Sequence, residues 1–332
     1  MRQETPPIQV ATAGEALIDM IRNPDGCFEP CIGGAVYNLT RALSRQGIGT
    51  LYLNPLSRDR FGRQLAAGLT EDGVHLARPE PVQEVTSLAV VSVDAAGQPD
   101  YAFYREGVAD RATSAGQLTT ACQQAHGLSL VCTGALALSP ADASTYLPWL
   151  ATQRDAGRVV VIDANLRPSV MPDLAAYRRH VLATLQLADV IKVSDEDLNH
   201  LDLPGTSEQE KAHHLLAHSQ ARFVALTCGK VGAYLLTRGG QQFHAHERHA
   251  LTVVDTVGAG DCFLAGLVVS LLEQGLPANW GTGSVQAAQA QALLQNAVAS
   301  ASLCVQRRGC APPLRDEVRT RVASGAISFE TA

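Results

Sequence analysis

Residues 255–261, Asp-Thr-Val-Gly-Ala-Gly-Asp, constrain the fold of this chain more than any other segment. A β-branched run at 251–254 precedes them and predicts a buried parallel strand. Behind them, apolar residues recur at helical spacing as far as Leu272, and Gly275 is a natural end for a helix. The sequence therefore predicts a strand, a turn of small residues and a helix in direct succession.

The turn offers an anion-binding site with a carboxylate beside it. Gly258, Ala259 and Gly260 leave backbone N–H groups uncovered at the positive end of the helix, which is where a phosphate binds. Asp261 places a carboxylate next to that anion, which costs energy unless the carboxylate has a task such as accepting a hydroxyl proton. A first-turn Asp that is merely favoured by the helix dipole would have the same sequence, so this segment alone leaves both interpretations open.

Two common nucleotide-binding motifs do not fit the chain. The dinucleotide fingerprint G-x-G-x-x-G requires a third glycine where Phe263 stands, which disfavours a dinucleotide-dependent oxidoreductase. A Walker loop requires Ser or Thr after Gly229-Lys230, and the chain has Val231 there and Val224 at the first glycine.

Residues 255–266 match the signature DTxGAGDxFxxG without a mismatch, and in this the chain resembles the ribokinase/fructokinase-type carbohydrate kinases, the PfkB family. In that family the Gly-Ala-Gly backbone forms the anion hole and the final Asp activates the sugar hydroxyl. The resemblance implies an anion hole at Gly258, Ala259 and Gly260 and a catalytic base at Asp261. It also implies ATP and Mg²⁺ as cofactors.

The amino-terminal part resembles the sugar site of the same family. Asp19 closes a GExLxD-like segment, is expected where a strand ends, and can accept hydrogen bonds from two neighbouring hydroxyls. Gly33, Gly34 and Asn38 match the family's amino-terminal signature. The glycines permit close approach to a ligand, and Asn38 offers both a donor and an acceptor to sugar hydroxyls.

Strands within about 15–35 and 86–108 are predicted to form a small β lid over the sugar, as in the family. Arg105 on this lid is predicted to reach substrate oxygens, the alternative being a solvated charge on an edge strand. Asn165 and Arg167 belong to a D-x-N-x-R segment that resembles fructokinases and ketodeoxygluconate kinases. Both are assigned to the substrate site, and Arg167 is a candidate for contacting the transferred phosphate.

The resemblance also implies a nucleotide site and a magnesium site. The nucleotide-binding residues are Ser194, Thr227, Gly229, Lys230, Gly232 and Asn296. Glu196 and Asp197 are assigned to Mg²⁺, largely through water, because magnesium needs few protein carboxylates. An ordinary helix N-terminus would look the same without any metal.

Many relatives bind a monovalent cation beside the anion hole, and the matching positions here are Asp255, Val257, Cys304 and Gly309. Backbone carbonyls that hold K⁺ there would fix the orientation of the loop and add positive charge where negative charge develops. In the alternative interpretation, Asp255 only caps the loop through hydrogen bonds to nearby backbone.

From residue 117 onward, helical patterns alternate with short apolar strands, which predicts a doubly wound, mostly parallel sheet flanked by helices. With the lid, residues 1–332 form a single ribokinase-like domain, of a length that can bury a full core. The net charge of -6 gives no general attraction to nucleic acid or anionic lipid. Without a signal region or a membrane span, the protein is expected to be cytoplasmic, and a homodimer is expected.

The eight cysteines are scattered through apolar patterns, as in a reduced core, and Cys27 with Cys31 lacks the second ligand pair of a zinc site. The predicted function is ATP-dependent phosphorylation of a sugar, with fructose first. 2-Dehydro-3-deoxygluconate and a nucleoside such as aminoimidazole riboside are the alternatives. A non-catalytic sugar-sensing protein is the alternative outside the enzymes, and the intact Asp261 argues against it because binding needs no base.

Overall fold

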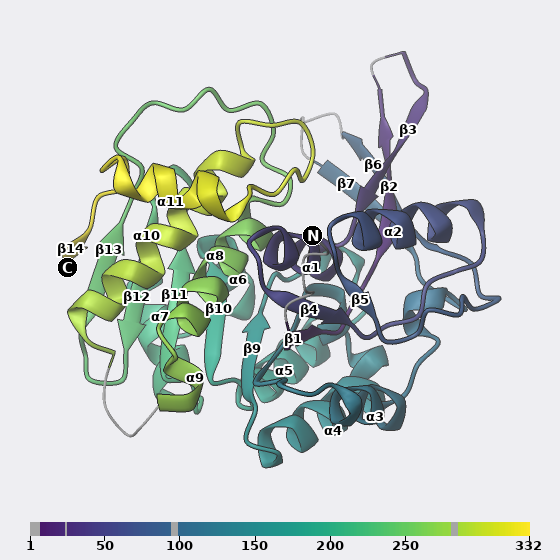
Figure 1. Cartoon of the computed structure of the whole chain (residues 1–332), viewed down its shortest axis with the longest axis horizontal. Coiled ribbons are helices and arrows are strands. Elements are labelled where there is room, and N and C mark those ends of the chain that lie inside the picture. Colours follow the sequence, from purple (N-terminus) through teal and green to yellow (C-terminus); the bar gives the residue numbers. More distant parts are fainter. Residues whose placement is uncertain (1–6, 24, 94–98, 280–284) are drawn as a thin grey trace, which may run out of the picture.

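The computed structural model describes residues 7–23, 25–93, 99–279 and 285–332. These residues form a ten-stranded sheet with the strand order β14-β13-β12-β11-β10-β9-β8-β1-β4-β5 (Figure 1). Its parallel strands are β1 (Ile8–Thr12), β4 (Gly49–Tyr52), β5 (His75–Leu76), β8 (Leu130–Gly134), β9 (Val159–Asp163), β10 (Val190–Ser194) and β11 (Phe223–Thr227). An antiparallel extension consists of β12 (Ala233–Thr237), β13 (Gln242–Ala245) and β14 (Glu330–Thr331).

The central strands are parallel because both of their faces are covered by helices, which their nearly continuous apolar runs require. One face packs against α1 (Ala35–Arg45), α8 (Ala259–Glu273), α10 (Ala287–Cys304) and α11 (Arg315–Ala323). The other packs against α3 (Ala115–Gln124), α4 (Ala143–Asp155), α5 (Leu174–Leu185), α6 (Asp195–Leu201) and α7 (Glu208–Ala217). In β9, Val159 and Val161 enter the first core while Val160 and Ile162 enter the second. The prediction of a doubly wound sheet is confirmed.

A second sheet of four strands rises beside the first (Figure 1), and its strands lie within the segments predicted for the lid, so we call it the lid sheet or lid. Its order is β3 (Phe28–Gly33), β2 (Leu17–Arg22), β6 (Ser87–Val93) and β7 (Pro99–Tyr104). Beneath it, α2 (Arg60–Glu71) contributes Leu65 and Leu69 to a core shared with Ile18 and Tyr37. The predicted hairpin of β6 and β7 is present, while its turn at 95–98 lies outside the described residues.

The helix predicted behind residue 261 is α8, but the strand predicted at 251–254 is wrong. No strand forms there, and Val253 and Val254 are each 57% exposed. The N–H groups of Val254 and Asp255 both donate to Val305 O, at 2.8 and 3.2 Å, so a helix end and not a neighbouring strand fixes this segment. β-Branched residues favour a strand only where a partner strand is available.

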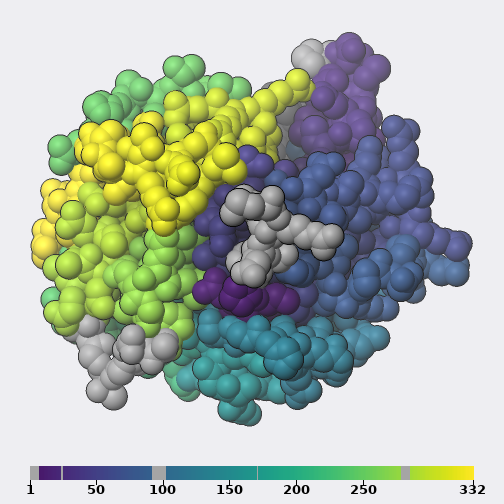
Figure 2. All heavy atoms as spheres, in the orientation of Figure 1, coloured from purple at the N-terminus to yellow at the C-terminus, as the bar shows by residue number. Residues whose placement is uncertain are grey.

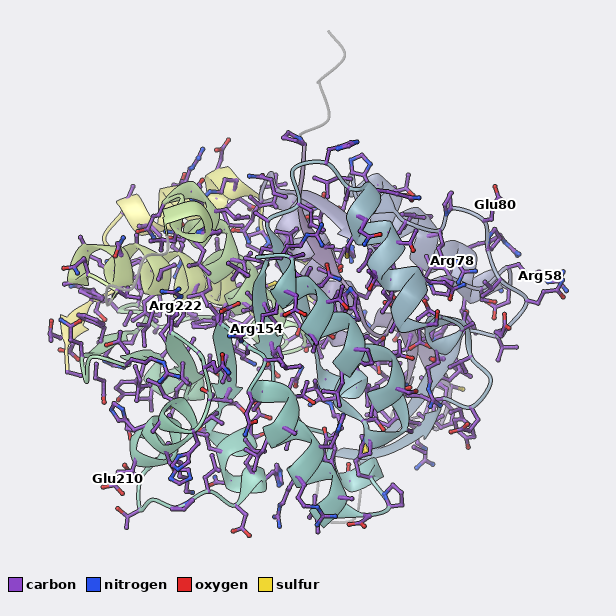
Figure 3. All side chains as sticks on the ribbon, turned by 90° about the horizontal axis from the view of Figure 1, so that it is seen from below. Arg58, Arg78, Glu80, Arg154, Glu210 and Arg222 are labelled. Carbon is purple, nitrogen blue, oxygen red and sulfur yellow. The ribbon has the colours of Figure 1, made fainter. Side chains whose placement is uncertain are left out.

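None of the described helices combines the length and the apolarity that a bilayer span requires. Seen from below, charged side chains such as Glu80 and Glu210 point outward at the periphery (Figure 3). The short helix α9 (Leu276–Asn279) completes the described elements between α8 and α10.

Candidate active site

The predicted catalytic residues gather where the carboxyl ends of the parallel strands meet the first turns of α1 and α8. Asp163 ends β9 and faces Lys192 of the neighbouring β10 in register. Asn38 lies in the first turn of α1, and its Nδ2 donates to Asp261 Oδ2 at 2.9 Å. Residues far apart in sequence therefore meet at the sheet edge where open α/β sheets bind ligands.

Asp261 is buried, with 7% exposure, and lines a cavity of about 10 Å³ together with Asp163 and Thr133. A cavity of this size holds about one water molecule. The pKa of Asp261 is raised to about 7: burial and the nearby Asp163 carboxylate raise it, while the hydrogen bond from Asn38 and the charges of Lys192 and Arg167 lower it. A carboxyl group with a pKa near neutrality is suited to accept a proton at neutral pH.

The turn before α8 presents free backbone donors. Gly258 has φ 76°, a left-handed conformation, and a Cβ added there would lie 2.2 Å from Cys310 Sγ, so only glycine fits. Ala259 N–H donates to Thr256 O, whereas the N–H groups of Gly260 and Asp261 find no acceptor among the described residues. Two free donors at a helix N-terminus can hold an anion. They include Gly260 of the predicted anion hole and add Asp261, whereas the predicted Ala259 donor is already engaged.

Lys192, which we did not assign to the site from the sequence, places a cation beside this turn. Its Nζ lies 3.0 Å from Asp163 Oδ1, and a Cβ added at Gly260 would lie 3.1 Å from the same Nζ. Burial lowers the pKa of Lys192, but the charges of Asp163, Asp197 and Asp261 outweigh it and the pKa is raised, so the ammonium ion is retained. The signal in the sequence was a charged residue inside an apolar strand.

Asp19 lies inside lid strand β2, not at the end of a core strand as predicted, because the chain enters the lid immediately after β1. Burial raises the pKa of Asp19 to about 6, while the charge of Arg167 lowers it. A Cβ added at Gly33 would lie 2.0 Å from Asp19 Oδ2, so this glycine makes room for the carboxylate. A Cβ added at Gly34, which has φ 106°, would lie 2.8 Å from Glu15 O.

Glu15 is a second residue that the sequence reasoning missed. Its Oε1 accepts the Ala35 N–H at 3.0 Å, at the start of α1, and its Oε2 is buried without a hydrogen-bond partner. Burial raises the pKa of Glu15 to about 7, while the charge of Arg105 lowers it. Asn38 Oδ1 is likewise buried without a partner, which leaves an acceptor free for a ligand hydroxyl.

Arg167 is central to this group of carboxyls. Its charge lowers the pKa of Glu15, Asp19, Asp163 and Asp261, yet it forms no ion pair with any carboxylate in the described part of the chain. Asn165, in a left-handed conformation with φ 35°, accepts from Arg167 Nη1 at 2.6 Å and so orients the guanidinium group. The predicted pair therefore consists of an available cation and the residue that positions it.

Arg105 is occupied by carboxylates. Its guanidinium lies 3.5 Å from Asp110 Oδ2 and 3.3 Å from Asp142 Oδ2, and it also donates to Leu136 O. Arg111 contacts the same Asp142 at 2.7 Å and Glu106 at 3.2 Å, so carboxylates balance the charges of both arginines. Arg105 is therefore not the solvated charge of the alternative, and its buried Nε has no hydrogen-bond partner among the described residues.

The two residues predicted to bind Mg²⁺ differ in whether their carboxylates are free. Asp197 Oδ1 accepts from Leu166 N at 2.7 Å and its Oδ2 accepts from Ser194 N at 2.8 Å, so the carboxylate caps α6 together with the Ser194 hydroxyl. Glu196, one residue earlier, is exposed. Asp197 does not fit a direct metal ligand, whereas Glu196 is free to bind a water of hydrated Mg²⁺.

The predicted nucleotide residues form two groups. Thr227 ends β11 in register with Ser194, and Gly229 and Lys230 follow it in an exposed loop that Gly232 closes against the Ala245 carbonyl. Asn296 lies apart. Its side chain donates to Ala292 O and accepts from Arg315, which also contacts Glu273 at the far end of α8.

Asp255 ties the predicted cation loop together. Its Oδ1 accepts from Val257 N at 3.0 Å and its Oδ2 from Gly309 N at 2.8 Å, while Cys304 Sγ donates to Val257 O. The four predicted residues are therefore neighbours. The same carboxylate also makes the capping bonds of the alternative interpretation.

The carboxyl-terminal segment meets the lid at the top of the molecule, where yellow and purple atoms touch (Figure 2). Arg308 Nη2 contacts both oxygens of Glu29 on β3, at 3.0 and 2.9 Å. This exposed pair joins the lid to the loop that follows α10. The same loop binds Asp255 through the Gly309 N–H, so it contacts both the lid and the segment that leads into the anion-binding turn.

Residues 8–317 match the pfkB family carbohydrate kinase. The chain is 33% identical over 266 residues to a fructokinase of Rhizobium leguminosarum bv. trifolii, with 79% of each chain covered. A fructokinase of Salmonella typhimurium is 30% identical over 274 residues, which cover 81% of this chain and 86% of the relative. The crystal structure of fructokinase with bound ATP from Xylella fastidiosa gives a TM-score of 0.81 at 25% identity, covering 96% of this chain and 98% of that one.

The fold, the geometry of the site and the matched relatives together define the class of protein. It is an α/β phosphotransferase with a ribokinase-like fold. The chain belongs to the pfkB family of carbohydrate kinases. The family, fold and enzyme class predicted from residues 255–266 are thereby confirmed.

The raised pKa of Asp261 predicts the pH dependence of activity. Because a base must be deprotonated and its pKa is about 7, kcat/KM for the sugar should fall as the pH drops below about 7. In Asn38→Ala the amide that stabilises the carboxylate is lost, so this limb should move to higher pH. Profiles of both proteins at saturating ATP test this. An unshifted limb in the variant would show that another group controls it.

Proposed function

We propose that this chain is a fructokinase that transfers the γ-phosphoryl group of ATP to a hydroxyl of fructose, with Mg²⁺ as cofactor. The observation that carries the proposal is the buried Asp261 carboxyl beside two free N–H donors and Lys192. Two relatives with 33% and 30% identity are named fructokinases, and the 25% identical solved structure is a fructokinase with bound ATP.

In the proposed reaction, the Asp261 carboxylate accepts the proton of the sugar hydroxyl, and that oxygen forms a bond to the γ-phosphorus as the bond to ADP breaks. The N–H groups of Gly260 and Asp261 and the Lys192 ammonium stabilise the charge on the transferred group. Glu196 would hold hydrated Mg²⁺, which supplies charge neutralisation for the nucleotide phosphates. Arg167, which forms no ion pair in the described part of the chain and whose charge lowers the pKa of Asp261, would contact the transferred phosphate.

The balanced charge of Arg105 at the lid favours a neutral sugar as the substrate. A substrate carboxylate needs an unpaired cation, because burying it alone is expensive. The charge of Arg105 is already balanced by Asp110 and Asp142, so it does not supply one. Arg167 has no ion pair among the described residues, but in the proposed reaction it contacts the transferred phosphate, so a substrate carboxylate would compete with that phosphate for it. This supports fructose over 2-dehydro-3-deoxygluconate.

A coupled assay of ADP release over ketoses, keto-deoxy acids and nucleosides tests the proposal. Fructose should give the highest kcat/KM. Activity on the keto-deoxy acid or on aminoimidazole riboside, with none on fructose, would replace the substrate but keep the kinase. Sugar binding without ADP release from any candidate would instead identify a sugar-sensing protein. The homodimer and the cytoplasmic location remain predictions.

Asp19→Ala and Asn38→Ala should raise the KM for the sugar while the KM for ATP changes little. Each loses a hydrogen bond to a hydroxyl, which is worth about 1–3 kcal/mol when the partner is charged and about 1 kcal/mol when it is neutral. Steady-state kinetics with each substrate varied in turn measure the two effects. An equal loss for ATP would mean that the sugar and nucleotide sites are reversed.

Replacing Na⁺ with K⁺ at constant ionic strength should activate the enzyme modestly. The Asp255 loop already holds its shape through hydrogen bonds to Val257 and Gly309, so a cation bound there would add charge and not create the loop. Measurement of kcat in K⁺, Na⁺ and tetramethylammonium tests whether a cation at this loop contributes to activity. Identical values would remove the cation from the proposal.

A further inference from the structure

Three cysteine side chains meet directly behind the anion-binding turn. Cys262 lies in the first turns of α8, Cys304 is the last residue of α10, and Cys310 lies in the following loop. Their Sγ atoms all lie within 4.8 Å of one another. Cys262 and Cys304 are fully buried and Cys310 is partly buried. Antiparallel packing of α8 on α10 brings together thiols that are 42 and 48 residues apart in sequence (304 − 262; 310 − 262).

The separation of these sulfurs suits metal coordination. All three cysteines are free thiols, and a disulfide would require the two sulfurs to approach to about 2.05 Å. Two metal–sulfur bonds of about 2.3 Å that open by about 120° place their sulfurs about 4 Å apart. The cluster therefore needs little rearrangement to surround a single ion.

We propose that Cys262, Cys304 and Cys310 form a binding site for one thiophilic d¹⁰ metal ion, with copper(I) the preferred ion, and that its binding lowers the activity of the enzyme. Soft thiolate ligands select copper(I) and zinc among the available metals. In the described part of the chain no His, Asp or Glu joins the group, and structural zinc usually takes four protein ligands. A three-sulfur donor set fits copper(I), which is stable with three ligands.

The surroundings offset part of the negative charge that thiolates bring. Cys262 follows the positive N-terminus of α8. Arg307 Nη1 donates to Ala311 O at 3.4 Å, one residue from Cys310. Both features lie at the cluster, so the site does not bury its anions without compensation.

The cluster is in direct contact with the turn that aims the phosphate donors. A Cβ added at Gly258 would meet Cys310 Sγ at 2.2 Å, so the sulfur lies against this glycine. Cys304 Sγ donates to Val257 O at 3.6 Å, and a metal-bound thiolate has no proton to donate. Metal binding would therefore remove one bond from Val257 and shift the sulfur that supports Gly258. The N–H groups of Gly260 and Asp261 would move from the position that binds the phosphate.

Anaerobic titration of the reduced full-length protein with copper(I) tests the site. Cys27→Ser/Cys31→Ser serves as the background, because Cys27 is exposed, Cys31 is partly exposed, and the pair could bind metal independently. Competition with a coloured copper(I) chelator and native mass spectrometry should give one ion per chain. Cys304→Ala and Cys310→Ala should each weaken binding about tenfold or more, the scale on which losses at metal sites are measured. Cys132→Ala, which removes a buried thiol of β8, should leave binding unchanged.

The readouts separate the site from its effect on activity, since that effect rests on the proposed function. If the background protein binds one ion and is inhibited, while Cys310→Ala neither binds the ion nor is inhibited, both the site and its effect on activity are supported. One bound ion with no kinase activity on any sugar supports the site and refutes the proposed function. A parallel zinc titration that binds more tightly at the same three thiols would keep the site but overturn copper(I) as its ion. Binding unaffected by both Cys304→Ala and Cys310→Ala, or no binding of either ion, would overturn the proposal.

Discussion

Replacing Asp261 with asparagine is expected to lower kcat by about 10²–10⁴, the range for a positioned general base, while nucleotide affinity stays nearly unchanged. Asparagine has the same shape, and its side-chain oxygen can still accept the bond from Asn38 Nδ2. Only the ability to take a proton is lost. The variant should also remain folded, because the neutral amide avoids burying a charge near Asp163. Steady-state kinetics with fructose, calorimetry with an ATP analogue and thermal denaturation measure the three quantities.

Asp316→Asn is the matched control for this prediction. Asp316 is also a first-turn carboxylate, in α11, but it is exposed and far from the site. If Asp261 served only the helix dipole, the two substitutions would have similar small effects on stability and neither would affect turnover. A kcat for Asp261→Asn within threefold of the wild-type value would contradict the assignment of the base.

Local patterns in the sequence were enough to predict the parts of the site that lie within the turn at 258–260 and the helix behind it. The small residues at 258–260 and the apolar spacing behind them predicted α8, and of the donors predicted there Gly260 is free while Ala259 is not. Gly33 was predicted to permit close approach to a ligand, and the structure shows a related reason, since the carboxylate of Asp19 occupies the space beside it. These features depend on neighbours in sequence or on a conformation that only glycine adopts easily.

Features that depend on neighbours in space could not be predicted in the same way. The contact of Lys192 with Asp163 is set by the register of β10 against β9, which no local pattern encodes. Asp197 was assigned to Mg²⁺, largely through water, from the resemblance of its segment to the family, yet both of its oxygens are used by backbone N–H groups. The residues at 251–254 have strand propensity but no partner strand. In each case the deciding partner comes from another part of the chain.

Replacing Lys192 with methionine should reduce kcat by about 10²–10³, the cost of losing one preorganised donor at a developing negative charge. Methionine preserves the length and apolar character of the side chain but leaves Asp163 buried without its partner. Breaking a buried ion pair in this way costs about 3–5 kcal/mol, so the free energy of unfolding should fall as well. Lys211→Met, a replacement on the polar face of α7, should change neither quantity.

The double variant Lys192→Met/Asp163→Asn separates the two effects. It leaves no unpaired charge at this position, so the free energy of unfolding should recover most of what the single variant loses. Turnover should not recover, because the cation near Gly260 is still missing. Recovery of kcat in the double variant would mean that Lys192 only neutralises Asp163. Stability restored without turnover would instead place the ammonium group at the transferred phosphate, the role that a Walker lysine fills in folds that have one.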